Sequence, residues 1–380
     1  MPTLRSDMKK VIHIVGARPN FMKVAPIHKA IAARTPLQQL VMHTGQHYDA
    51  KMSDVFFADL GMAAPDIHLG IGSGSHAEQT AKMMVEMEKI FLKEKPDLVS
   101  VVGDVNSTIA AALVTSKLAI PLSHVEAGLR SFERHMPEEI NRVVTDRLSD
   151  LLLTPSRDAD ANLLKEGIDP KRIHLVGNVM IDSLLSSKEK ADQLPTLKQL
   201  GLTPRTYVVA TLHRPSNVDN PKLLAGLLST LIHVAKKVPV VFPVHPRTRK
   251  MIAEQGLAAE LEKTPSLKLV DPMGYLEFLS LTSQAQLVMT DSGGLQEETT
   301  ALNVPCLTLR EETERPVTVE VGTNEVVGTD PTRIREAADR ILAGDVKKGR
   351  VPELWDGRTG ERIADLYARV LGVETKRAFG

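Results

Sequence analysis

The stretch VIHIVGARPN, residues 11–20, combines an apolar run, a glycine turn and the start of a helical run that continues to about Ala33. The same order of apolar run, turn and helical run recurs along the chain, for example from Leu98–Val102 and from Leu122–Val125. These runs are continuously apolar, which is typical of parallel strands that are buried on both faces. The alternation of strands and helices therefore predicts an α/β fold built on parallel sheets.

A second series of the same kind begins after residue 200. Tyr207–Leu212 and Val240–Val244 are predicted strands, and Pro221–Lys237 is the predicted helix between them. Residues 186–204 are polar and carry no strand signal, so we expect a domain junction within or just before them. The count predicts two Rossmann-like domains facing a cleft, which is a common place for a ligand. The last helical run, about Glu361–Leu371, is compatible with packing on either domain.

The composition excludes several classes of protein. Of the 380 residues, 42% are apolar and 25% are charged, as in ordinary globular proteins and unlike disordered or collagen-like chains. Lys plus Arg and Asp plus Glu each number 47, so the formal net charge is zero. A general nucleic-acid binder usually carries a basic excess, and therefore we expect no nucleic-acid partner.

The cysteine content and the apolar runs bear on the compartment. The single cysteine, Cys306, cannot form an internal disulfide, which favours a reducing compartment, and its place in a predicted buried strand indicates a core thiol. No stretch approaches the ~20 apolar residues of a membrane span. Met1–Lys10 lack the apolar core of a signal peptide. We therefore expect a cytoplasmic protein that does not engage a membrane.

Polar residues gather where the predicted strands end, which is where ligands bind in open α/β sheets. The stretch DSGG, residues 291–294, follows a predicted strand and opens a helix, so its backbone N–H groups favour an anion such as a diphosphate; a plain strand-to-helix turn is the alternative. The dinucleotide and Walker A fingerprints are missing, and neither a His-Glu-x-x-His motif nor a cysteine pair is present. The sequence therefore predicts no cofactor and no metal.

Three carboxylates are candidates for acid–base chemistry. Asp104 and Glu126 follow neighbouring predicted strands, and Glu138 follows Pro137 at a predicted helix start. Acid–base work near neutral pH needs a carboxyl group with a raised pKa, and crowding of several acids supplies one. The pattern alone makes Glu138 a partner of the helix dipole rather than a catalyst.

Seven motifs in order carry a resemblance to a known family. They are GARPNFMK (16–23), TGQH (44–47), GD (103–104), HVEAGLR (124–130), PEEINR (137–142), DSGGLQEE (291–298) and TERP (313–316). Together they resemble the non-hydrolysing UDP-N-acetylglucosamine 2-epimerases, and the resemblance covers about residues 9–370. It implies inversion at C2 of UDP-GlcNAc to give UDP-ManNAc, through anti elimination of UDP to a bound 2-acetamidoglucal and its re-addition, without cofactor or metal.

The resemblance also implies an architecture and a set of site residues. The fold would be glycosyltransferase-B-like and homodimeric, with domains at 1–183 and 184–361 and a final helix in 362–380 crossing back to the first domain. The motifs place catalytic roles on Asp104, Glu126, Glu138 and His213. They place substrate and UDP contacts on Arg18, Lys23, Arg142, Asn178, His213, Phe278, Ser292, Gly293, Gly294, Glu298 and Arg315. The candidate allosteric residues are Gln46, His47, Arg214 and His245.

Other functions stay open. The combination of residues 44–50 with the stretch HPRTR, residues 245–249, also resembles a sister group that epimerises UDP-2,3-diacetamido-2,3-dideoxyglucuronate. Arg247 or Arg249 would then face the extra carboxylate, or both would lie on a helix surface. A hydrolysing epimerase, a glycosyltransferase of the same fold and a non-enzymatic UDP-sugar sensor are further alternatives.

The chain departs from the family where activated bacterial members bind a second UDP-GlcNAc. Those members read HRREN where this chain has HRPSN (213–217), and they supply an arginine that residues 70–80 lack here. We predict that activation by UDP-GlcNAc is weak or absent, so that initial rates follow a hyperbola. A progress curve with a clear lag, or a sigmoidal dependence on UDP-GlcNAc, would contradict this prediction.

Overall fold

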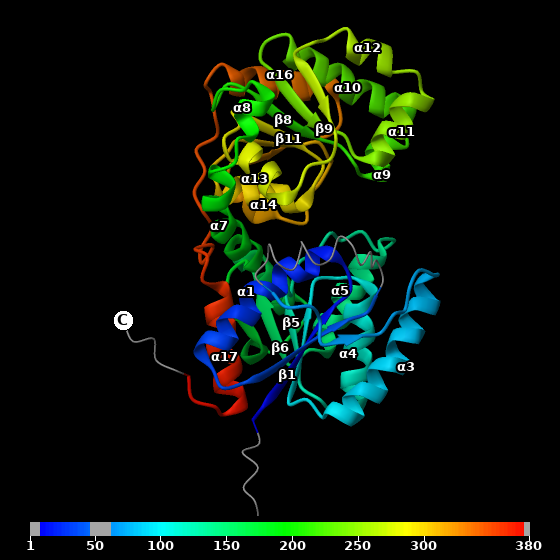
Figure 1. The fold of residues 1–380 in the computed structure, drawn as a ribbon, viewed down its shortest axis with the longest axis vertical. Helices are drawn as coiled ribbons and strands as arrows, with labels where there is room; N and C mark the ends of the chain where they lie inside the picture. Colours follow the sequence, from blue (N-terminus) through cyan, green and yellow to red (C-terminus); the bar gives the residue numbers. More distant parts are fainter. Residues whose placement is uncertain (1–7, 46–61, 376–380) are drawn as a thin grey trace, which may run out of the picture. The chain divides into compact units, whose positions relative to one another are not determined.

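The structure is a computed structural model that describes residues 8–45 and 62–375. The chain divides into two compact units, one formed by Met1–Ser183 with Glu353–Gly380 and the other by Leu184–Pro352. The chain thus re-enters the first unit at Glu353, whereas the sequence analysis placed this return at residue 362. Figure 1 shows the elements of each unit.

Within the described residues, the first unit holds a parallel sheet of seven strands in the order β3-β2-β1-β4-β5-β6-β7. Its strands are β1 (Lys10–Val15), β2 (Gln38–His43), β3 (Ile67–His68), β4 (Leu98–Val102), β5 (Leu122–Val125), β6 (Leu151–Thr154) and β7 (Ile173–Leu175). Its helical segments are α1 (Arg18–Arg34), α3 (His76–Glu94), α4 (Asn106–Leu118), α5 (Pro137–Leu148), α6 (Arg157–Lys165), η1 (Pro170–Arg172), the start of α7 (Val179–Asp192) and α17 (Thr359–Leu371).

Alternate residues of each strand point to opposite faces, and the sheet of the first unit is buried on both of them. Val11 and Val15 of β1 pack with α1 and α17, whereas Ile12 and Ile14 pack with α3 and α4. This double burial explains why the strands are apolar throughout.

The final helix, α17, packs on the first unit beside α1 (Figure 1). Gly360 lets its first turn approach closely, because a Cβ there would lie 2.6 Å from the backbone oxygen of Pro26. The Asp182 carboxylate accepts hydrogen bonds from the N–H groups of Thr359 (3.1 Å) and Gly360 (2.7 Å), and Tyr367 is fully buried. The expected return of this helix to the first domain is confirmed.

In its described part, the second unit holds a parallel sheet of six strands in the order β10-β9-β8-β11-β12-β13. Its strands are β8 (Val208–Thr211), β9 (Val240–Pro243), β10 (Leu267–Val270), β11 (Leu287–Thr290), β12 (Cys306–Thr308) and β13 (Asn324–Val326). Its helices, after the end of α7, are α8 (Thr196–Leu200), α9 (Pro215–Val218), α10 (Pro221–Ala235), α11 (Pro246–Glu254), α12 (Ala258–Glu262), α13 (Tyr275–Ser283), α14 (Gly293–Ala301), α15 (Pro316–Glu320) and α16 (Pro331–Leu342).

The predicted α/β class with parallel sheets is confirmed. Cys306 lies fully buried in β12, and burial raises the pKa of its thiol to about 12, so the predicted core thiol is also confirmed. Two short strands, β3 and β13, were not predicted from the sequence. Among the helices of residues 8–45 and 62–375, none combines the length and the apolar character that a bilayer crossing requires.

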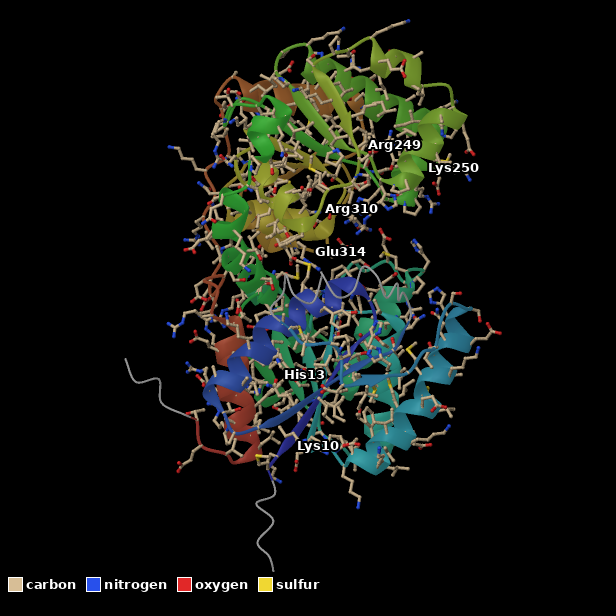
Figure 2. All side chains as sticks on the ribbon, viewed as in Figure 1. Lys10, His13, Arg249, Lys250, Arg310 and Glu314 are labelled. Carbon is tan, nitrogen blue, oxygen red and sulfur yellow. The ribbon has the colours of Figure 1, made fainter. Side chains whose placement is uncertain are left out.

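A buried histidine in the first sheet makes stability depend on pH. His13, labelled in Figure 2, is fully buried in β1, with its Nε2 atom 3.1 Å from Oε1 of Gln39. Burial, together with the neighbouring His28, lowers the pKa of His13 to about 3, although Gln39 opposes this shift. Because the unfolded chain takes up this proton below about pH 6.5 and the folded chain does not, the contribution of His13 to stability is lost as the pH falls from 6.5 toward 3.

We expect His13→Gln to flatten the pH dependence of the free energy of unfolding. Between pH 7 and pH 5 the wild type should lose about 2 kcal/mol through this one group, and the variant should not. Urea unfolding of both proteins at several pH values measures the difference. Parallel pH profiles for the two proteins would contradict the prediction.

Candidate active site

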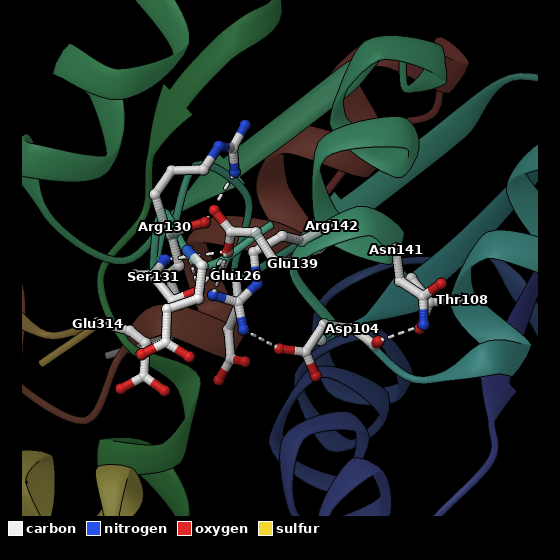
Figure 3. Close-up of polar contacts among 12 residues, drawn as sticks. Asp104, Thr108, Glu126, Arg130, Ser131, Glu139, Asn141, Arg142 and Glu314 are labelled. Carbon is white, nitrogen blue, oxygen red and sulfur yellow. Dashed lines mark hydrogen bonds and ion pairs between the residues drawn. The ribbon is translucent and has the colours of Figure 1, made fainter. Parts of the chain in front are cut away.

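The first unit presents Asp104 at the end of β4, held on two sides by α5. The side chain of Asp104 is 32% exposed, and its carboxylate accepts a hydrogen bond from Arg142 (Figure 3). Its backbone oxygen accepts another from the Asn141 amide at 2.9 Å. Asn141 and Arg142 are adjacent residues of α5, so one helix fixes both the backbone and the side chain of Asp104.

Glu126 follows the neighbouring strand β5 in a strained conformation. Its φ angle is +69°, in the left-handed region that costs a residue with a Cβ about 1–3 kcal/mol. The carboxylate is 7% exposed and accepts a hydrogen bond from Nζ of Lys23 at 2.5 Å. A Cβ on Gly103 would lie 3.2 Å from Nζ of Lys23 and 3.8 Å from Oε2 of Glu126. The Glu126 carboxylate therefore lies beside the turn that leads into Asp104.

The two glutamates at the start of α5 differ in their surroundings. Glu138 is half-buried in the first turn, where the helix dipole favours an anion, and its side chain has no hydrogen bond or ion pair to any other described residue. Glu139 is buried and accepts hydrogen bonds from the N–H groups of Ser131 (2.9 Å) and Phe132 (3.0 Å) and from Arg142 (3.0 Å). Glu138 is thus the glutamate with an uncommitted carboxylate, and Glu139 fixes the loop after Glu126.

The sequence analysis missed Glu139 and the buried Asp146. Both lie on the inner face of α5 together with Arg142, at spacings of three and four residues. That spacing of charged residues was the available signal, since it places three of them on one side of a helix whose other side is exposed.

In the second unit, Asp291 holds His213 at the end of β8. The carboxylate of Asp291 is fully buried and accepts hydrogen bonds from the backbone N–H groups of His213 (2.9 Å) and Arg214 (3.0 Å). Nδ1 of His213 lies 2.8 Å from Oδ1 of the same carboxylate, and the imidazole is 42% exposed. Burial opposes the ionisation of Asp291, but His213 and the two N–H groups outweigh it and lower the Asp291 pKa. Asp291 therefore orients the ring so that Nε2 points away from it.

Three arginines surround a buried glutamate near the start of α14. Glu314 accepts hydrogen bonds from Arg214 (3.1 Å) and Arg310 (2.8 Å); Figure 2 labels Arg310 and Glu314. Burial alone would raise the Glu314 pKa, yet Arg315, Arg310 and Arg214 lower it well below its usual range. Arg315 itself forms an ion pair with Glu297 at 2.6 Å. Two carboxylates, Glu314 and Glu297, thus hold the three arginines in place.

The N-terminus of α14 carries two glycines in its first turn. Ser292 is its N-cap residue, and Gly293 and Gly294 form its first turn. A Cβ on Gly294 would meet nothing within 4 Å, so packing within this unit does not require glycine there. Farther along the helix Glu298 is buried, and its burial together with the charge of Glu297 raises the Glu298 pKa to about 7, with Tyr275 partly opposing. Phe278 of α13 packs partly buried against the core beside this helix.

The remaining predicted residues vary in their placement. Asn178 is buried and accepts a hydrogen bond from the N–H of Met180 at 2.9 Å, while its amide nitrogen has no partner among the described residues. His245 is exposed and caps α11. Gln46 and His47 lie outside the described residues, as does the side chain of Arg18. Within residues 8–45 and 62–375 no group of three His, Cys, Asp or Glu side chains is placed to hold a metal ion.

Comparisons with known proteins agree on one family. A family model described as UDP-N-acetylglucosamine 2-epimerase matches residues 29–368. The UDP-N-acetylglucosamine 2-epimerase of Methanococcus maripaludis is 43% identical over 364 residues, which cover 94% of this chain and 98% of that protein. The UDP-2,3-diacetamido-2,3-dideoxy-D-glucuronate 2-epimerase of Pseudomonas aeruginosa is 42% identical over 366 residues, with 95% and 100% coverage. The crystal structure of Methanocaldococcus jannaschii UDP-GlcNAc 2-epimerase in complex with UDP-GlcNAc and UDP matches with a TM-score of 0.84, 42% identity, and 95% and 99% coverage.

Proposed function

The chain belongs to the UDP-N-acetylglucosamine 2-epimerase family and is an isomerase, and from this premise we propose that it interconverts UDP-GlcNAc and UDP-ManNAc without releasing free sugar. One observation carries the proposal. Asp104 and Glu126 follow the adjacent strands β4 and β5, and each carboxylate pairs with its own cation, which suits the acid–base roles that we propose for them.

Inversion at C2 requires two proton-transfer groups, because the proton leaves from one face of the sugar and returns to the other. In the forward direction a carboxylate takes the C2 proton, the C1–O bond to UDP breaks, and a C1–C2 double bond forms in 2-acetamidoglucal. UDP oxygen then adds back to C1 while a second group protonates C2 from the opposite face. Asp104, Glu126 and Glu138 are the groups we propose for these transfers, and positioned carboxyl groups typically accelerate such steps by about 10²–10⁴-fold.

The second unit supplies the groups we propose for UDP. The N–H groups at the start of α14 suit a diphosphate, and Arg315 adds positive charge. His213, oriented by Asp291, is suited to the departing diphosphate oxygen. We assign the ribose hydroxyls to Glu298 and the uracil to Phe278.

The choice of UDP-GlcNAc over the diacetamido-uronate sugar rests on the surroundings of α11. A uronate would require a cation for its extra carboxylate. Arg247 is exposed and donates to Asp219 at 2.9 Å, and Arg249 is exposed and donates to Asp271 at 2.8 Å. Both arginines thus already have acidic partners. The similar identity to the Pseudomonas aeruginosa relative keeps the uronate sugar as the second candidate. The homodimer implied by the resemblance stays a prediction.

We expect the protein to convert UDP-GlcNAc to UDP-ManNAc in deuterated water with deuterium incorporated at C2 and no added cofactor. The physical reason is that proton removal and return involve groups that exchange with solvent. Proton NMR of the reaction over time measures both the product and the label. Asp104→Asn should lower kcat at least about 100-fold, because the amide cannot take up the proton.

The other outcomes of this experiment separate the alternatives. Free ManNAc with stoichiometric UDP would identify a hydrolysing enzyme instead. Turnover of the diacetamido-uronate sugar, without turnover of UDP-GlcNAc, would favour the second candidate. UDP-ManNAc without deuterium at C2 would contradict the proton-transfer mechanism.

Glu298 should make nucleotide-sugar binding depend on pH. With a pKa of about 7 in the free protein, this carboxyl group is mostly protonated at pH 6 and mostly ionised at pH 8. Since the ionised form accepts hydrogen bonds from ribose hydroxyls, affinity should rise about tenfold from pH 6 to pH 8. Calorimetry with UDP-GlcNAc in the Asp104→Asn background, which stops turnover, measures this rise.

Glu298→Gln provides the control for that measurement. The amide does not titrate, so the tenfold dependence should disappear in this variant while binding persists. An unchanged pH slope in Glu298→Gln would assign the dependence to another group, such as His213, and would overturn the role of Glu298.

A further inference from the structure

A histidine two residues before Glu126 has both ring nitrogens facing hydrogen-bond acceptors. His124 lies in β5 and is fully buried. Its Nδ1 atom is 2.6 Å from Oδ1 of Asp146, and its Nε2 atom is 2.9 Å from the backbone oxygen of Gly103. A carboxylate and a carbonyl oxygen can only accept. Both hydrogen bonds therefore form only when the ring carries both protons, as an imidazolium.

The charges around His124 balance when the ring is protonated. Asp146 also accepts hydrogen bonds from Arg130 (2.7 Å) and from the N–H of Gly128 (3.1 Å), and Arg130 binds Glu166 through two further bonds of 2.7 Å. The cluster then holds two cations, His124 and Arg130, against two carboxylates, Asp146 and Glu166. A neutral His124 would leave the lone pair of one ring nitrogen facing an acceptor inside the protein, which is costly.

The hydrogen bond to Gly103 acts on Asp104. The Gly103 carbonyl belongs to the peptide group that leads into Asp104, and Gly103 adopts a left-handed φ of +70°. The Gly103 N–H donates to the Val125 oxygen at 3.1 Å, so β5 binds both the N–H and the carbonyl oxygen of Gly103. The carbonyl of Asp104 is held separately by Asn141. His124 is thus the contact that fixes the peptide plane on the N-terminal side of Asp104.

We propose that His124, held as an imidazolium by Asp146, is a positioning residue that aims the Asp104 carboxylate at the sugar. The inference rests on the proposed function, because it assigns to Asp104 a place in proton transfer. Full burial prevents His124 from contacting the substrate, so its effect is transmitted through the Gly103–Asp104 peptide. A misplacement of about 1 Å at a reacting group can lower a rate about 100-fold.

Two substitutions separate the effect of the hydrogen bond between His124 and Gly103 from the effect of packing. His124→Phe keeps a ring of similar size and removes both donors. His124→Gln places an amide N–H near the former Nε2 position, where it can still donate to Gly103. His13 provides the matched control, because it is an equally buried histidine in β1 of the same sheet with no hydrogen bond to the Asp104 turn.

We expect His124→Phe to lower kcat about 100-fold with KM within about threefold, and His124→Gln to recover kcat to within about fivefold of wild type. His13→Phe should change kcat less than about twofold. Affinity for UDP should be the same in all of these variants. Equal kcat in His124→Phe and His13→Phe, or no recovery in His124→Gln, would overturn the positioning role.

The protonation of His124 has a readout that does not depend on activity. In ¹⁵N-histidine-labelled wild-type protein in the buffer of the activity assay, both ring nitrogens of His124 should carry a proton, whereas His13 should carry one. A single ring proton on His124 would overturn the imidazolium assignment, even if His124→Phe does not fold. A wild type with two ring protons but no epimerase activity would overturn the proposed function and, with it, the catalytic meaning of the position.

Discussion

The ends of β4 and β5 in the first unit depend on the hydrogen bonds and ion pairs of the Asp146 carboxylate. It is fully buried, where an isolated charge costs several kcal/mol. Burial alone would raise its pKa, but the charges and hydrogen bonds of His124 and Arg130 lower it. This carboxylate binds three groups: His124 of β5 and, in the loop after β5, Arg130 and the N–H of Gly128. Through His124 it also reaches the turn after β4. Removing one partner from such a network typically costs about 3–5 kcal/mol, so the network ties the Gly103–Asp104 turn to the loop that carries Glu126.

In the second unit a buried aspartate also binds a histidine, but this histidine is partly exposed. Asp291 is also fully buried and also holds a histidine, together with the backbone at a strand end. The difference lies in the exposure of the imidazole. His124 has none and acts on the backbone, whereas His213 is 42% exposed and has its second nitrogen directed outward. The depth of the histidine thus decides whether a buried aspartate holds a turn in the interior or an imidazole at the surface.

Much of the fold was predictable because its signal is local. Continuous apolar runs and the turns after them located β4 and β5 to the residue, because strands that are buried on both faces are apolar throughout. The strands β3 (sequence IH) and β13 (sequence NEV) were missed because neither contains an apolar run. The polar residues at strand ends could be located for the same reason. Their partners Glu139 and Asp146 could not, because a carboxylate that will be buried looks in the sequence like one on a solvated helix or turn.

The strain at Glu126 shows what these partners contribute. A non-glycine residue with a φ of +69° is unfavourable by about 1–3 kcal/mol and persists only where its surroundings fix it. Here Lys23 binds the Glu126 side chain, and two residues later the N–H of Gly128 donates to Asp146. The backbone of Gly128 also packs closely, because a Cβ on it would lie 2.4 Å from the backbone oxygen of Ala159. The strand end has no freedom to relax, so the carboxylate of Glu126 stays beside the Gly103–Asp104 turn. Rigid placement of the two acids suits the proton transfer that we propose, because their orientation is set before the substrate arrives.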